Sequence, residues 1–600
     1  MLTRPTHDMS EAEIHRDLSV ANVREHVIRI ATQIPTRLAG SANGRRMAEY
    51  SAEAMRRAGV AADVHELSAI VSFPGAADLQ IRSPVELTVD ASTLGHSVAT
   101  SEDGVAATLL DVGGGGFEDY AGRAAAGTIA LVELSRPPAR HEKQRIAALR
   151  GCAGVVMINW GTPDSAAVPY GSVKSAWGVP TERMLHAEMP TLPCVGIARS
   201  AGLRLQEMAK RDEVRVWLRT HVENPWCPVQ ITVGQISPQG DDDDFVIVGG
   251  HQDSWFGEAA TDNAAGNACM LELARVFHLH RHELRRGIVF GFWTAHETGT
   301  MSGSAWFADR HWDRLREHAV GYLQIDQPAC AEARVWGSWS NSEMKRFHQS
   351  VERRLLPGRD LAWERAGKMG DASFFGLGVP MMQGNGVYTR EQLAATAGAT
   401  FGWWHHTMHN TLDKIDWAAM DDHLRVYGSY LWELCTASIL PYEFVTVADE
   451  FIGRLEQLLP LGAVVGLDVT LSKAHIFRAQ ALELERAAQA LRACAPPHSD
   501  AFERKAHAIN RCLKRLSRLL IPIQSTAIGT YGHDMYGYTP QSRMIPSLHD
   551  VDRLAHTSVN TPARWMLETA LVRERNRVTD ALSDGTMLIA DTLASVRSMT

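Results

Sequence analysis

Side chains that can bind a metal ion follow the ends of three short apolar runs in the middle of the chain. They are imidazoles and carboxylates, which supply nitrogen and oxygen ligands for zinc and can also transfer protons. The chain has no GxSxG turn for a serine nucleophile and no cysteine with an evident partner histidine, so the pattern favours a metal centre. In chain order the candidates are His251 and Asp253, then His296 and Glu297, then Asp326.

The three apolar runs must position these side chains. Residues 245–248, 287–293 and 320–325 are rich in Val, Ile, Phe and Tyr. Such continuous apolar runs are typical of strands that are buried on both faces of a parallel sheet. Because open α/β sheets bind ligands at the carboxyl ends of their strands, we expect the candidate side chains to meet at that edge. The predicted fold class is therefore α/β, with a mostly parallel sheet flanked by helices.

The length of 600 residues predicts two to four domains, since a single core rarely grows so large. Residues 1–75 have the pattern of helices that pack on the sheet domain, and the sheet itself is expected in 226–442. Between them, 76–225 contains short β-like runs separated by glycine-rich turns, which predicts an inserted β-rich domain. Residues 443–600 are mostly amphipathic and predict an all-α C-terminal domain.

Composition and charge exclude several classes of partner. Hydrophobic residues make up 45% and charged residues 22% of the chain, which is typical of a soluble globular protein. The net charge of -9 argues against nucleic acid and against a basic membrane-binding face. No apolar run approaches the roughly 20 residues that cross a bilayer, and the first residues lack the apolar core of a signal peptide. Eight cysteines without a CxxC pair predict reduced thiols in a cytoplasmic protein.

A pair of metal ions would account for the number of candidate ligands. Two ions about 3.5–4 Å apart need one bridging carboxylate, two further protein ligands each, and a shared water. Asp262 would bridge, His251 and Asp326 would bind one ion, and Glu297 and His406 would bind the other. Nitrogen and oxygen ligands without cysteine suit zinc, with manganese or cobalt as alternatives.

Two further side chains near this set have open roles. Asp253, two residues after His251, is expected to hold that imidazole from outside the metal centre. His409 lies four residues after His405, and on a helix these two would form an alternative metal-binding pair.

Several segments in the right order resemble the di-zinc aminopeptidase superfamily, and most of all its branch with glutamate carboxypeptidase II and the transferrin receptor. They are HQDSW, DNAAG, TGTMSGSAWFA, LQID and WWHHTMHNTLDKID. The resemblance covers nearly the whole chain: 76–225 resembles the protease-associated domain of that branch, and 443–600 its helical dimerisation domain, which implies a homodimer. It implies two zinc ions and selects His406 rather than its histidine neighbours. The implied ligands are His251, Asp262, Glu297, Asp326 and His406.

Position 296 departs from that family. Active members have a second glutamate there, which takes a proton from the metal-bridging water, whereas this chain has His296. Histidine can do the same, because its ordinary pKa is about 6.5 and nearby dications lower the pKa further. We therefore expect a two-metal hydrolase of amide bonds, related to aminopeptidases and carboxypeptidases, with His296 as the base. The alternative of another class is a non-catalytic binding scaffold like the transferrin receptor; a single-metal cyclotransferase is disfavoured, because such enzymes are smaller and lack both added domains.

The expected substrate pocket also departs from the family. Glutamate-selective relatives carry arginines just after the segment that matches GLGVPMM, where this chain has QGNGVY, so no preference for acidic substrates is expected. His405, Trp404 and Tyr388 would suit an aromatic or apolar group, and a small N-acyl or aryl amide is an alternative to a peptide. Arg543 ends a segment that resembles the family's pocket loop, so it is a candidate partner for a substrate carboxylate. Asn410 stands where the family has an aspartate.

Overall fold

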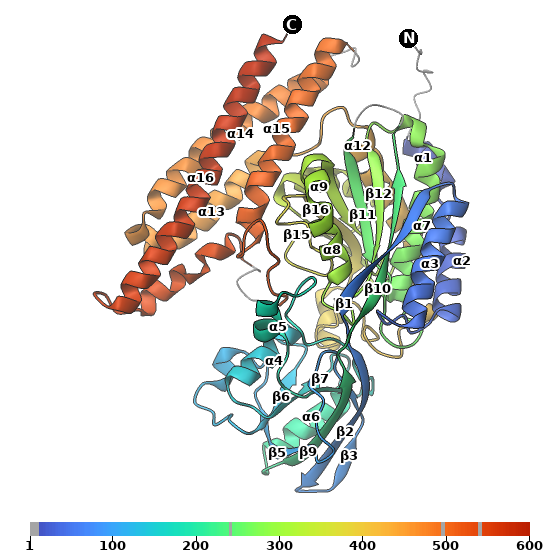
Figure 1. The fold of residues 1–600 in the computed structure, drawn as a ribbon, viewed down its shortest axis with the longest axis vertical. Helices are drawn as coiled ribbons and strands as arrows, with labels where there is room; N and C mark the ends of the chain where they lie inside the picture. Colours follow the sequence, from blue (N-terminus) through green and yellow to red (C-terminus); the bar gives the residue numbers. More distant parts are fainter. Residues whose placement is uncertain (1–10, 239–242, 494–498, 538–542, 600) are drawn as a thin grey trace.

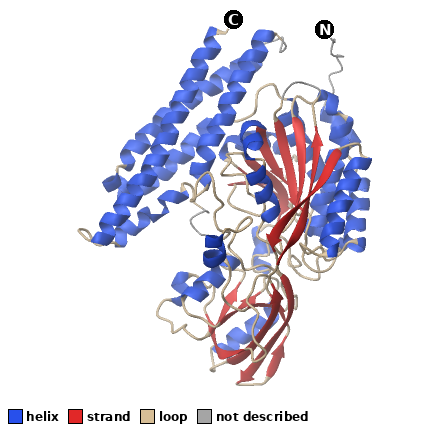
Figure 2. Ribbon diagram, viewed as in Figure 1, coloured by secondary structure: helices blue, strands red, loops and turns tan. Residues whose placement is uncertain are grey.

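The computed structural model describes residues 11–238, 243–493, 499–537 and 543–599. Figure 1 shows three parts: a sheet domain with helices on both faces, a smaller β-rich part below it, and a bundle of long helices beside it. In Figure 2 the strands fall into two separate groups, which correspond to two sheets.

The larger sheet has eight strands within the described residues, in the order β1-β10-β12-β11-β13-β16-β14-β15. Strand β11 pairs in parallel with both β12 and β13, whereas β1, β10 and β12 are joined by antiparallel pairings. The predicted α/β sheet is thus confirmed as a mixed sheet whose parallel centre is β11. The strands are β1 Ala61–Ile70, β10 Trp226–Ile236, β11 Phe245–His251, β12 Gly287–Trp293, β13 Ala319–Gln324, β14 Val335–Ser340, β15 Leu361–Arg365 and β16 Met381–Val387.

The three apolar runs form the strands expected of them, β11, β12 and β13. Every residue of these strands is buried, which explains why their sequences are continuously apolar rather than alternating. Gly250, near the end of β11, allows a close approach of the backbone, because a Cβ there would lie 2.3 Å from the carbonyl oxygen of Ile325.

Helices cover both faces of this sheet (Figure 1). On one face, α2 packs on α7, and Val23, Val27 and Ile30 of α2 recur at helical spacing and are buried. The segment 1–75, expected to be helical, also contains strand β1. The helices of this face are α1 Glu11–Asp17, α2 Val20–Gln33, α3 Ala42–Arg57, α7 Gly266–Leu279, α10 Lys345–Leu355 and α12 Trp417–Thr436. On the other face lie α8 Ser302–Arg310 and α9 Trp312–His318.

The β-rich part leaves the sheet domain after β1 and returns in β10. These two strands pair along their whole length, from Ala61 with Gln235 to Ile70 with Trp226, so the segment between them enters and leaves at neighbouring points. Its sheet has the order β3-β2-β4-β8-β7-β6-β5-β9, with an added pairing of β2 and β9. The elements are β2 Phe73–Ser83, β3 Leu87–Val89, β4 Ala91–Thr93, β5 Val105–Asp111, β6 Ile129–Glu133, β7 Gly154–Ile158, β8 Cys194–Ile197, β9 Arg215–Glu223, α4 Arg140–Leu149, α5 Glu182–Glu188 and α6 Arg199–Ala209.

The C-terminal region is helical, as predicted. Arg518 on α15 is buried and ties the bundle to the sheet domain, because its guanidinium donates to carbonyl oxygens of Leu315, Arg316 and Gly378. Within the described ranges, no helix combines the length and the apolar character needed to span a bilayer. The long helices are α13 Phe444–Gly462, α14 Leu467–Ala493, α15 Asp500–Ser525 and α16 Pro562–Ser598. Shorter elements are α11 Arg390–Ala395 and the turns η1 Phe117–Tyr120, η2 Ala260–Ala265, η3 Arg281–Glu283, η4 Ser342–Met344, η5 Leu412–Lys414, η6 Ala463–Val465 and η8 Pro546–His556.

Candidate metal centre

The candidate ligands meet where the order of the strands reverses. After β11 the chain forms β12, which pairs on one side of β11, and then returns to form β13, which pairs on the other side of β11. In open α/β sheets, ligands bind at such a reversal, at the carboxyl ends of the strands. His251 is the last residue of β11, Glu297 follows β12, and Asp326 follows β13.

Asp262 lies between two groups of candidate ligands. Its Oδ1 is 3.0 Å from Nε2 of His251, which is itself 3.2 Å from Oδ1 of Asp326. Its Oδ2 is 3.3 Å from Nε2 of His406, which lies 3.0 Å from Oε1 of Glu297. The two oxygens of one carboxylate therefore face two different histidines, which is the arrangement required of a bridge between two ions.

Neighbouring side chains hold the candidate ligands in place. Oε2 of Glu297 accepts a hydrogen bond of 2.8 Å from Nε1 of Trp255. Asp253 contacts His251 through its backbone carbonyl oxygen, 2.9 Å from Nδ1. The carboxylate of Asp253 instead accepts the backbone N–H groups of His296 and Glu297, at 3.2 and 3.0 Å. Oδ1 of the same carboxylate also lies 3.9 Å from Nδ1 of His251. Asp253 thus fixes the loop after β12 with its side chain, and it contacts the imidazole with both its main chain and its carboxylate.

Asn410 supports the loop of Asp262 rather than His406. Its side-chain oxygen accepts hydrogen bonds from the backbone N–H and the hydroxyl of Thr261, both at 2.9 Å. Nδ1 of His406 has no hydrogen-bond partner within the residues that the structure describes. An asparagine oxygen is sufficient for this role, because a neutral amide oxygen accepts both hydrogen bonds.

His296 stacks on His251, with ring centroids 3.9 Å apart. Its Nδ1 lies 2.8 Å from Oδ2 of Asp371, which is fully buried. The ring also needs Gly370, because a Cβ at that position would lie 2.0 Å from Cε1 of His296. Burial and the charge of His251 lower the pKa of His296, but Asp371 and Glu297 raise it, and the protein's own groups together leave this pKa above its ordinary value.

The donor set fits divalent cations. Three largely buried carboxylates converge here, and burying such charges without a counter-charge is costly. Burial alone would lower the pKa of His251, yet Asp326 and Asp262 raise it well above its ordinary value, which reflects the negative potential of the site. Within the described chain, His251, Asp262 and Glu297 each offer one donor atom within 4.8 Å of the others. Imidazole and carboxylate donors without thiolates suit zinc.

The family assignment comes from the sequence between β10 and α12. Residues 232–431 match the sequence model of Peptidase family M28. The chain contains a peptidase family M28 domain. This segment includes all five candidate ligands as well as His296 and Asp371.

Curated proteins similar to this chain include peptidases and a receptor. The chain is 24% identical to Aminopeptidase NAALADL1 of Rattus norvegicus over 287 residues, which are 40% of this chain and 37% of that protein. It is 31% identical to a probable glutamate carboxypeptidase of Arthroderma benhamiae over 108 residues, 18% of this chain and 15% of the relative. Transferrin receptor protein 1 of Gallus gallus is 24% identical over 250 residues, 35% of this chain and 32% of the receptor. These matches thus span well under half of the length of each relative.

Solved structures show the same fold. A peptidase M28 precursor from Shewanella amazonensis superposes with a TM-score of 0.58 at 20% identity, over 72% of this chain and 96% of that one. A zinc aminopeptidase from Bacillus subtilis gives a TM-score of 0.54 at 19% identity, over 71% of this chain and 97% of the other.

The aromatic side chains predicted for the substrate pocket of the M28 domain occupy different surroundings. His405 lies in the metal centre, with Nδ1 3.3 Å from Oδ2 of Asp262. Trp404 is only 4% exposed and packs edge-on against Tyr388, with ring centroids 6.5 Å apart. The hydroxyl of Tyr388 donates to the carbonyl oxygen of Ala331 at 2.9 Å. Trp404 and Tyr388 therefore form part of the packing around the site.

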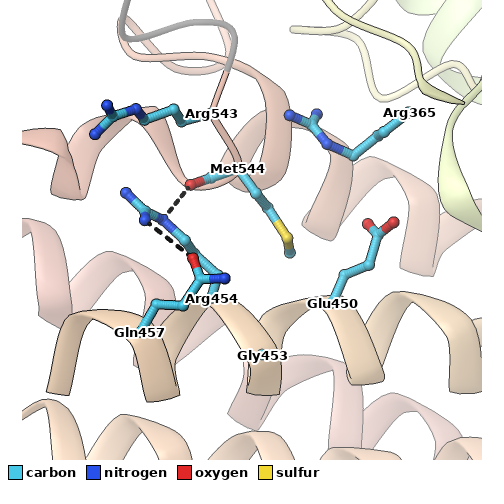
Figure 3. Close-up of a pocket in the computed structure, with 7 residues that line it drawn as sticks. All are labelled: Arg365, Glu450, Gly453, Arg454, Gln457, Arg543 and Met544. Carbon is cyan, nitrogen blue, oxygen red and sulfur yellow. Dashed lines mark hydrogen bonds between the residues drawn. The ribbon is translucent and has the colours of Figure 1, made fainter.

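Arg543 is not placed as expected. Its guanidinium pairs with Asp552 at 2.9 Å, and in the described residues it makes no hydrogen bond or ion pair with a candidate ligand. Figure 3 shows it above α13 at the rim of a cavity of about 550 Å³, which Arg365 and Arg454 also line. Residues 538–542 of the segment expected to reach the pocket lie outside the described residues. Tyr536 of that segment contacts His141, with ring centroids 4.2 Å apart and planes inclined by 47°.

Two cations beside the M28 centre, the buried Lys174 and the half-buried Arg140, come from the β-rich part and were missed in the sequence. Nζ of Lys174 donates to the carbonyl oxygen of His296 at 3.2 Å, and burial lowers the pKa of Lys174 to about 8 although Glu297 raises it. Burial also lowers the pKa of Arg140, and Glu297 again opposes this shift. Gly171 makes room for Arg140, because a Cβ there would lie 1.8 Å from Nη1. No local pattern marks these residues, since the fold alone brings them to the site.

Proposed function

We propose that the M28 domain is a co-catalytic two-metal hydrolase of amide bonds, acting as an aminopeptidase or a carboxypeptidase does. The observation that carries the proposal is Asp262, whose two oxygens face His251 on one side and His406 on the other. The names of the relatives, an aminopeptidase and a probable glutamate carboxypeptidase, support the reaction class. His251 and Asp326 would hold one ion, and Glu297 and His406 the other.

Bound zinc ions would supply Lewis acidity to the scissile carbonyl and lower the pKa of water. The chain's own contribution to proton transfer is His296. With Nδ1–H donated to Asp371, the other ring nitrogen, Nε2, carries the lone pair that can accept a proton. The same nitrogen can return that proton to the leaving amine. Asp253 fixes the backbone at His296 and Glu297, because its carboxylate accepts hydrogen bonds from both of their backbone N–H groups.

The two cations bear on the substrate. Lys174 and Arg140 are charged groups that the fold holds beside Glu297 at a cost in hydration, and they fit an anionic group such as the terminal carboxylate of a peptide. A peptide with a free terminus is therefore the proposed substrate. A small N-acyl or aryl amide on the same site is the alternative, because the aromatic rings of Trp160 and Tyr170 lie close to His405 and Trp255.

Metal analysis tests the proposal first. The purified chain should contain close to two equivalents of zinc, manganese or cobalt, lose its activity to a chelator, and regain it when the metal is restored. Peptide and aryl amide substrates, each with and without a free carboxylate, should then separate the two substrate classes. A chain that binds no metal after reconstitution would instead favour a non-catalytic scaffold, which the similarity to transferrin receptor protein 1 keeps as the second candidate.

The other two parts of the chain have proposed roles as well. The β-rich part is proposed to be a protease-associated domain that contributes Lys174 and Arg140. The helical bundle is proposed to form a homodimer, because it exposes large apolar side chains. These include Val469, Ile476, Trp565, Met566 and Met587. Light scattering on the purified protein measures the dimer directly.

A cytoplasmic location is proposed because the seven described cysteines form no disulfide.

Asp371 is proposed as a positioning residue for His296. The variant Asp371→Asn should lower kcat about 10-fold or more, because the carboxylate no longer fixes which ring nitrogen carries the proton. KM and metal content should change little, since Asp371 contacts none of the candidate ligands through a hydrogen bond in the described structure. Steady-state kinetics and elemental analysis measure both, and partial rescue by Asp371→Glu is expected. Equal losses of kcat and metal would indicate that Asp371 only stabilises the fold and does not position His296.

A further inference from the structure

His405 occupies a position that the five-ligand scheme does not use. Its Nδ1 lies 3.3 Å from Oδ2 of Asp262, the same oxygen that Nε2 of His406 approaches at 3.3 Å. These three side chains are buried, and their donor atoms all lie within 4.8 Å of one another. Nδ1 of His405 is a buried atom without a hydrogen-bond partner in the described chain.

The spacing of these donors matches that around a zinc ion. Ligands bound at 2.0–2.1 Å with tetrahedral angles lie about 3.3–3.4 Å apart. The 3.3 Å separations of Asp262 from His405 and from His406 therefore suit donors that share one ion. A buried imidazole nitrogen with no hydrogen bond is costly in a folded protein, and a metal ion would satisfy it.

The β-rich part holds the ring of His405 in this orientation. Trp160 stacks on it with centroids 5.7 Å apart and planes inclined by 19°. His406 also stacks on it, with centroids 3.8 Å apart and planes inclined by 28°. The side chain of His405 is 9% exposed as a result. Packing an imidazole against two rings reduces the conformational freedom that it would lose on binding a metal.

We propose that His405 is an additional protein ligand of the ion held by Glu297 and His406, an inference that rests on the proposed two-metal function. That ion would then have four protein donors, from Asp262, Glu297, His405 and His406, whereas the ion at His251 and Asp326 would have three. The two positions should consequently differ in affinity. The position with His405 should bind its ion more tightly than the other position, because it has one more protein ligand.

Cobalt titration of the chelator-treated, full-length chain tests this inference, because Co²⁺ absorption in the visible range reports the ligands of the ion. His405→Phe removes the nitrogen and keeps an aromatic ring against Trp160. The control His409→Phe changes an exposed histidine four residues away, whose ring is tilted by 50° against that of Trp403. We expect His405→Phe to weaken one equivalent of Co²⁺ about 10-fold or more and to change its spectrum, with the other equivalent and the control unchanged.

The outcomes separate the inference from the proposed function. Two equivalents bound by His405→Phe with native affinity and spectrum would overturn the role of His405 and leave the two-metal centre standing. Equal loss of both equivalents would also overturn it, since that would indicate that His405 positions Asp262 and is not a ligand of one ion. A native chain that binds no cobalt would refute the proposed function itself. If the phenylalanine variant does not fold, as judged by circular dichroism, His405→Gln replaces it in the same titration.

Discussion

Replacing His296 by alanine is expected to lower kcat by about 10²–10⁴-fold, the usual contribution of a general base, while the protein keeps its metal and its fold. The reason is that no candidate ligand depends on the imidazole: His296 stacks on His251 and binds Asp371, but Asp253 fixes the loop of Glu297 through backbone N–H groups that the substitution leaves in place. Turnover of a peptide or amide at saturating substrate, together with elemental analysis, measures both effects.

Two variants control this experiment. His409→Ala removes an exposed imidazole from the same loop region as His406 and should leave kcat unchanged. His296→Glu installs the acidic base of the related active peptidases and should recover a large part of the rate. Full activity of His296→Ala would show that another group takes the proton. Loss of metal in that variant would indicate that His296 is a metal ligand, a role that its position near His251 and Asp326 also allows.

The centre of the fold is predictable from the sequence because burial on both faces leaves a direct signature. Strands β11, β12 and β13 are buried at every residue, so each appears as an uninterrupted apolar run with a polar side chain at its end. The run ends point to His251 and Asp253, to His296 and Glu297, and to Asp326, without selecting the metal ligands among them. Asp262 and His406 lie in loops without such a signature, so their assignment required the resemblance to a family.

Residues that reach the site from a distance could not be predicted. Asp371, Arg140 and Lys174 meet His296 and Glu297 only through tertiary contacts, and their local sequences resemble ordinary loop and helix segments. Asp253 shows a different limit. Alternation along a strand suggested that its side chain would hold the ring of His251. Because β11 ends at that histidine, the carboxylate lies 3.9 Å from Nδ1, and the backbone carbonyl oxygen makes the closer contact at 2.9 Å.

Arg543 was proposed from the resemblance alone, without a local signal in its own sequence. The resemblance aligned its segment with a loop that reaches the substrate pocket, but Asp552 lies nine residues further on and pairs with the guanidinium. The two side chains are about half exposed, and surface ion pairs of this kind contribute little energy, so the pair alone does not explain where Arg543 lies.

Replacing Asp262 by alanine is expected to remove both metal ions, and with them the activity. A ligand that belonged to one ion would leave the other in place, but Asp262 offers one oxygen to the side of His251 and the other to the side of His406. Without it, Glu297 and Asp326 would have to balance two dications alone, at a site where buried charge is poorly compensated by water. The metal content should therefore fall from about two equivalents to close to zero, as measured by elemental analysis after dialysis.

Asp262→Asn and Asp309→Ala make this result interpretable. The asparagine keeps the volume and the hydrogen-bonding shape of the aspartate but removes its charge, so it should also lose both ions if charge is what bridges them. Asp309 is an exposed aspartate whose carboxylate contacts His533, and its replacement should leave the metal content unchanged. Retention of one full equivalent by Asp262→Ala would mean that the carboxylate serves a single ion and that the two positions are independent. In that case the bridging geometry of the free side chains would not persist in the loaded protein, and the two-metal reaction would lose its main structural support.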